Sequence, residues 1–104
     1  VPIFLFTVSD QEARHDLRAR MFAPQYGIAE DPATGSANGC LAGYLVRHRV
    51  LGEAYVSVTV EQGYEMGRPS LLHLRAERDD TGADAGITVQ VGGRVQLVAT
   101  GELV

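Results

Sequence analysis

The sequence predicts an α+β fold in which a mostly antiparallel sheet wraps around one central buried helix. Three observations support this prediction. Residues 35–46 have the composition of a buried helix, strand-like runs stand before and after them, and the runs after them are joined by turn-forming residues. With 104 residues, 45% hydrophobic and 21% charged, residues 1–104 are predicted to form a single domain with one core.

The first predicted strand is Ile3 to Val8, which is apolar at nearly every position. Such a run is typical of a strand that is covered on both faces. Ser9 followed by Glu12 then fits a capping box and favours a short helix. Residues 17–22 either continue that helix or form a strand, and local rules leave both open.

A long loop is expected next, because Pro24, Gly27 and Pro32 break regular structure. The predicted helix follows it. Gly35, Gly39 and Gly43 recur along one face of that helix and form a bare stripe. Because each glycine costs about 1 kcal/mol relative to alanine inside a helix, we expect the stripe to serve close packing against strands or another helix.

Four strands are predicted after the helix. Residues 54–60 alternate between polar and apolar side chains, and residues 71–76 form a second candidate. Residues 78–86 are polar and glycine-broken, which indicates an exposed connection. Residues 87–91 and 94–100 then predict a hairpin that turns at the Gly92-Gly93 pair.

Composition argues against several classes of function. The net charge of -4 disfavours binding to nucleic acid. The lone Cys40 cannot form an internal disulfide, and with three scattered histidines it makes no zinc pattern, so we expect no metal and a reducing, cytoplasmic compartment. No apolar run is long enough to span a membrane. A first residue of Val1, with a strand following at once, suggests an excised piece, and a processed mature protein is the alternative.

The loop before the helix carries the candidate chemistry. The amides of Gly35, Ser36 and Ala37 should point out of the helix N-terminus, where they can bind a carboxylate, and Asp31 adds a titratable group. This corner can bind an acidic substrate and hold or move its proton. The alternative is that Asp31 and Thr34 simply cap the helix.

Residues 30–37, Glu-Asp-Pro-Ala-Thr-Gly-Ser-Ala, resemble the signature of the PhzF phenazine-biosynthesis family, which has the diaminopimelate epimerase-like fold. The resemblance extends over nearly the whole chain. Further similar segments are residues 20–24, 61–63, 66–70, 91–93 and 101–103.

The resemblance implies that this chain is the C-terminal lobe of a two-lobe isomerase that needs no cofactor. In that family the active site lies between the lobes, and a glutamate of the N-terminal lobe, absent here, moves a proton within dihydro-hydroxyanthranilate. By resemblance Asp31 is the catalytic candidate in this lobe, and Thr34, Gly35, Ser36 and Ala37 are the substrate-binding candidates.

The same resemblance implies a strand at residues 17–22 and an isolated chain that is inactive without its missing N-terminal lobe. The small carboxylate substrate would be dihydro-hydroxyanthranilate-like or amino-acid-like. A homodimer or other homo-oligomer is expected, because an isolated lobe exposes a bare sheet edge or its cleft face.

Two alternative functions remain open. The first is a non-catalytic anion-binding or assembly module. The second is an epimerase or racemase of small amino acids, for which Cys40 would have to be a reactive thiol, whereas its place in the helix favours a buried packing residue. For Arg68 we expect a carboxylate partner within the lobe, and a reach into the cleft is the alternative.

Overall fold

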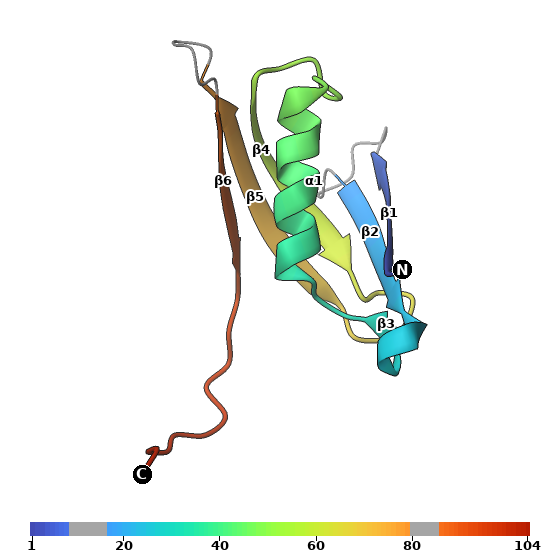
Figure 1. Ribbon diagram of the computed structural model, residues 1–104, viewed down its shortest axis with the longest axis vertical. Helices are drawn as coiled ribbons and strands as arrows, with labels where there is room; N and C mark the ends of the chain where they lie inside the picture. The colour runs from blue at the N-terminus through green and yellow to red at the C-terminus, as the bar shows by residue number, and fades with distance from the viewer. Residues whose placement is uncertain (9–16, 80–85) are drawn as a thin grey trace.

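The computed structural model describes residues 1–8, 17–79 and 86–104, and shows one α-helix packed on a six-stranded sheet (Figure 1). The α+β class predicted from the sequence is confirmed. The elements are β1 (Ile3–Val8), β2 (Leu17–Ala23), the 3-10 helix η1 (Pro24–Tyr26), β3 (Ile28–Asp31), α1 (Gly35–Arg47), β4 (Tyr55–Gln62), β5 (Ser70–Arg78) and β6 (Ile87–Gly93).

The sheet has the order β1-β2-β4-β5-β6, and β3 pairs with the end of β2. Neighbouring strands are antiparallel except β2 and β4, which are parallel. Parallel neighbours need a crossover connection, and α1 provides it on the way from β2 and β3 to β4. The crossover places the start of α1 directly after β3, where the candidate residues lie.

The core lies between one face of α1 and the sheet. Leu41, Leu45 and Val46 of the helix pack with inward-facing residues of the sheet such as Val60 and Leu74. The alternation predicted for residues 54–60 is confirmed, since its valines face this core. Figure 1 shows α1 lying over the sheet, with β6 on one flank and β1 and β2 on the other.

The opposite face of α1 is exposed, and Cys40 belongs to it. The prediction that Cys40 is buried is therefore wrong. The helix packs through residues 38, 41, 42, 45 and 46, and Cys40 lies on the other side of the helical wheel.

The glycine stripe of α1 faces β6. A β-carbon at Gly39 would lie 3.6 Å from Val91 Cγ2, and one at Gly43 would lie 3.9 Å from Val89 Cγ2. The expected packing against a strand is thus present at these two positions. Both distances are ordinary contacts and leave room for a methyl group, and at Gly35 nothing lies within 4 Å of the added carbon.

Strand β1 is confirmed, but it is not covered on both faces. Ile3 and Leu5 are 54% and 55% exposed, so among the described residues no layer covers this face of β1, which is an edge strand of the sheet. Residues 17–22 form a strand, as the resemblance implies, and the loop predicted across Pro24 to Pro32 contains η1 and β3. The capping box at Ser9 and residues 80–85 lie outside the described residues.

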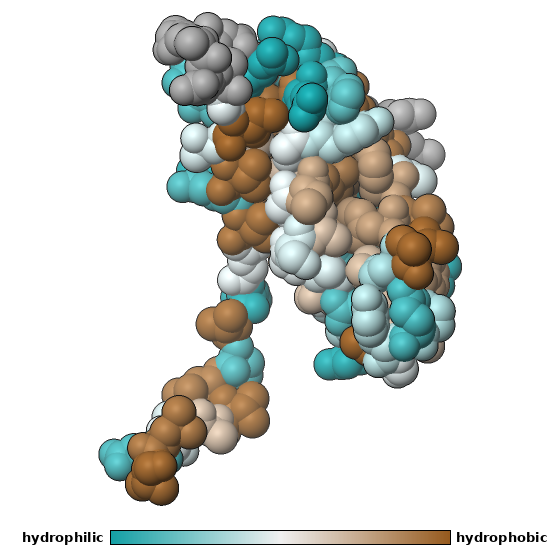
Figure 2. Space-filling model, in the orientation of Figure 1, coloured by the Kyte–Doolittle hydropathy of each residue, from teal (hydrophilic) through white to brown (hydrophobic). Residues whose placement is uncertain are grey.

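The predicted hairpin at Gly92-Gly93 is wrong. Gly92 and Gly93 continue β6 and pair with His73 and Leu72 of β5, and neither has the positive φ that a tight two-residue turn needs. Residues 94–104 form no strand and extend away from the sheet (Figure 1). Figure 2 shows apolar residues along this segment. Within the described residues, no helix is long and apolar enough to cross a membrane.

Candidate functional site

The candidate corner is a short turn between β3 and α1. β3 ends at Asp31, immediately before Pro32, and α1 begins at Gly35. One oxygen of the Asp31 carboxylate accepts a hydrogen bond from the Thr34 hydroxyl at 2.5 Å. The Asp31 side chain is therefore held over the turn that leads into the helix.

Thr34 occupies the N-cap position of α1, but its side chain makes no capping hydrogen bond. The hydroxyl donates to Asp31 and accepts from Gln62, so it does not reach the first amides of the helix. The alternative interpretation, in which Asp31 and Thr34 cap the helix, is therefore wrong.

The backbone amides of Gly35, Ser36 and Ala37 consequently have no hydrogen-bond acceptor in the part of the chain that the structure describes. Gly35 and Ser36 are exposed, and Ala37 is half-buried. Unpaired amides at a helix N-terminus carry a partial positive charge and are a ready binding site for a carboxylate. The predicted residues 31 and 34–37 are thus brought together in one corner.

A buried amide pair, Gln62 and Asn38, fixes the backbone of this corner. The Gln62 side-chain amide donates to the Asp31 carbonyl at 2.9 Å and to the Thr34 hydroxyl at 2.8 Å. The Asn38 amide donates to Gln62 Oε1 at 2.9 Å and to the Thr34 carbonyl at 2.8 Å. Both side chains are fully buried, so these bonds form away from competing water.

Sequence reasoning missed Gln62 and Asn38, although one signal was present. Extending the alternation of β4 places Gln62 on the same inward face as Val56, Val58 and Val60. A glutamine at an inward position must find buried hydrogen-bond partners, which the adjacent loop supplies.

Gly63 lets the loop approach the end of β4 closely. Its φ is +84°, and a β-carbon there would lie 2.1 Å from the Arg68 carbonyl oxygen and 2.8 Å from the Pro32 carbonyl oxygen. Only glycine fits this position, because any side chain would collide with two backbone segments.

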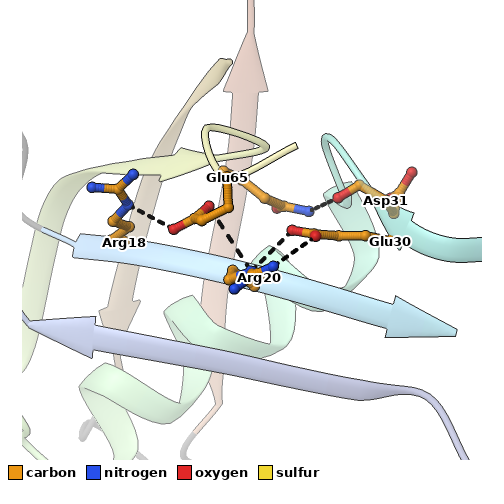
Figure 3. A network of polar contacts seen from close by, with 6 residues as sticks. Arg18, Arg20, Glu30, Asp31 and Glu65 are labelled. Atoms are coloured by element: carbon orange, nitrogen blue, oxygen red, sulfur yellow. Dashed lines mark hydrogen bonds and ion pairs between the residues drawn. The ribbon is translucent and has the colours of Figure 1, made fainter. Parts of the chain in front are cut away.

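Ion pairs on the outer face of β2 hold β3 and the turn after β4. Arg20 binds the Glu30 carboxylate through two hydrogen bonds of 2.9 and 3.1 Å, and Arg18 binds Glu65 at 2.9 Å. The hydrogen bonds between Arg20 and Glu30 lower the pKa of Glu30 and raise the pKa of Arg20. Figure 3 shows Glu30 directed at Arg20, whereas the neighbouring Asp31 side chain points away from it. The Glu30 carboxylate is thus bound in an ion pair, whereas the Asp31 carboxylate lies in the candidate corner.

Arg68 does not find the carboxylate partner that was expected. Its backbone amide bonds to Gly63, but its guanidinium makes no ion pair or hydrogen bond among the described residues. The adjoining turn is tied to the sheet by Glu65 instead. Within residues 1–8, 17–79 and 86–104, no three His, Cys, Asp or Glu side chains form a metal-ligand cluster.

The fold and the corner together define a class of protein: an α+β lobe whose helix opens with unpaired amides beside a carboxylate. Residues 2–101 match the family described as phenazine biosynthesis-like protein (PhzC-PhzF). The chain belongs to this family, as its resemblance to the PhzF signature indicated.

Several curated relatives are isomerases by name. The chain is 45% identical over 87 residues to the trans-2,3-dihydro-3-hydroxyanthranilate isomerase of Pseudomonas chlororaphis, a match that covers 84% of this chain and 30% of that protein. It is 32% identical over 103 residues to an uncharacterised isomerase of Clostridium acetobutylicum, covering 97% of this chain and 33% of that protein. The chain therefore spans about a third of the length of these relatives.

Proposed function

We propose that this chain is the C-terminal lobe of a PhzF-like isomerase that moves a proton within a small carboxylate-bearing substrate, without a metal or organic cofactor. The substrate is dihydro-hydroxyanthranilate-like or amino-acid-like. The amides of residues 35–37 hold the substrate carboxylate, and Asp31 holds or moves a proton beside it. The second acid/base group comes from an N-terminal lobe.

One observation carries this proposal: the unpaired amides of α1 open beside a carboxylate that the protein keeps in place. Thr34 donates to Asp31 and does not cap the helix, so the corner retains free donors for an anion. A carboxylate of the substrate would replace the missing acceptors, which stabilises its charge. The isomerase names of the relatives support the same type of reaction.

Asp31 is suited to a proton-handling role because, among the residues that the structure describes, its carboxylate is not paired with a cation. Its neighbour Glu30 takes both hydrogen bonds from Arg20, while the Asp31 carboxylate receives a neutral hydroxyl. A general acid or base must also lie within hydrogen-bond reach of the reacting atom. Asp31 is the one such group in this corner among the described residues, so we expect the isolated chain to be inactive.

The test uses the full-length protein that contains both lobes. Deuterium incorporation from D₂O into trans-2,3-dihydro-3-hydroxyanthranilate and into small amino acids should be followed by NMR. Asp31→Asn keeps the shape and the acceptor for Thr34, and it should slow exchange by about 100-fold or more, the typical contribution of general acid/base catalysis.

Glu53→Gln is the matched control, because it removes one exposed carboxylate outside the candidate corner, and it should leave exchange unchanged. If Asp31→Asn exchanges as fast as the unmodified protein but binds the acid more weakly, the corner only binds anions and the binding-module alternative is correct. Exchange catalysed by the isolated chain would disprove its inactivity.

A further inference from the structure

A cavity of about 610 Å³ adjoins the candidate corner. It lies between the N-terminus of α1, the first residues of β5 and the end of β6, which meet at one end of the molecule (Figure 1). Its volume falls within the range of small-molecule binding sites. Gly35, the first residue of α1, forms part of its wall.

The charge of the cavity wall differs from that of the chain. The chain has 13 acidic residues and a net charge of -4, yet neither aspartate nor glutamate lines this cavity. Arg94 is the one lining residue with a permanent charge. Its guanidinium has no ion pair or hydrogen bond within the residues that the structure describes. An unpaired arginine in a cavity without carboxylates favours an anionic ligand.

The remaining wall suits an apolar or ring-shaped body. Pro69, Leu72 and Val91 provide apolar surface, and Tyr64 also lines the cavity. Ser70 and His73 add two side chains that can form hydrogen bonds. A ligand in this cavity is therefore offered an apolar surface, a few polar contacts and one positive charge.

We infer that this cavity receives the body of a small organic acid, and that Arg94 is the residue that selects acids over neutral compounds of the same shape. The inference rests on the proposed function, because it takes the substrate to be bound at the start of α1. It adds Arg94 to the proposed site as a specificity-determining residue.

The test measures binding of benzoate and benzamide, which share a ring and differ in charge, to the 104-residue chain by NMR titration. Benzoate should shift the backbone amides of Gly92 and Gly93, which line the cavity. Arg94→Gln should weaken benzoate binding by about fivefold and leave benzamide binding unchanged. The difference should shrink at high salt, since the cavity is open to solvent.

Arg47→Gln is the control, because it removes an arginine at the opposite end of α1 that likewise has no ion pair or hydrogen bond among the described residues, and it should change neither affinity. Equal benzoate affinity for Arg94→Gln and the unmodified chain would overturn the inference, and so would the absence of any shift at Gly92 and Gly93. Either result leaves the Asp31→Asn exchange experiment intact, so failure of the cavity and failure of the proposed function are distinguishable.

Discussion

The conformation of the corner requires a residue without a side chain at position 63, which is Gly63. Its left-handed backbone is strained for any other amino acid, and the Pro32 and Arg68 carbonyl oxygens occupy the space of a β-carbon. Gly63→Ala must therefore displace the loop that carries Asp31. We expect it to lower the free energy of unfolding by at least about 2 kcal/mol in urea denaturation.

A substitution at Gly52 separates the effect of backbone strain from the effect of the steric collision. Its φ is also +84°, but nothing lies within 4 Å of an added β-carbon. Gly52→Ala thus introduces the backbone strain without the collision and should cost about 1 kcal/mol. If both variants lose the same stability, the close approach of Pro32 to Gly63 has no energetic consequence.

At the scale of elements, the side chain of Gln62 joins β4 to the loop and to α1. Gln62→Leu would fill a similar volume but would leave the part-buried Asp31 carbonyl and the buried Asn38 amide without this partner. Because unpaired buried polar groups are costly, we expect a loss of about 3 kcal/mol in the free energy of unfolding. Amide hydrogen exchange at residues 31–38 should become faster.

Gln90→Leu serves as the comparison, because Gln90 is an exposed residue of β6 with no hydrogen bond of its side chain within the described residues. It should change the free energy of unfolding by less than about 0.5 kcal/mol. A Gln62→Leu protein as stable as Gln90→Leu would contradict the role assigned to the buried amide pair.

Elements with a regular pattern were predictable from the sequence. The alternation in residues 54–60 gave β4, and the small, apolar residues 35–46 gave α1. The Gly92-Gly93 pair predicts a turn but forms part of a strand, since glycine suits both conformations and the pairing with β5 decides between them. Likewise, the apolar sequence of β1 does not determine whether one or both faces of the strand are covered.

The residues of the corner itself were predictable from the sequence, but the residues that hold them in place were not. Residues 31–37 are adjacent in sequence, and the family signature marks them. Gln62 and Gly63 act on them from about 30 residues away, through contacts that only the folded chain creates. Local rules also predicted a cap at Thr34, because they see a threonine before a helix and not the buried glutamine that turns its hydroxyl away.

At the scale of the whole molecule, the segment after β6 is the most exposed apolar part of the described chain. Val95, Leu97 and Val98 are 96%, 76% and 89% exposed, and Leu103 and Val104 follow at the end. Apolar side chains in an extended segment favour pairing with another sheet edge or another copy. The exposed edge strand β1 offers such an edge.

Removal of residues 95–104 should therefore reduce self-association without unfolding the lobe. The deleted segment contributes no strand and none of the buried core, so the free energy of unfolding should change by less than about 1 kcal/mol. Sedimentation velocity at increasing concentration should show a smaller oligomeric fraction than for the 104-residue chain. The double variant Val95→Thr, Leu97→Thr keeps the length and should act in the same direction. Unchanged association in both would assign the contact to β1 or to the exposed face of α1.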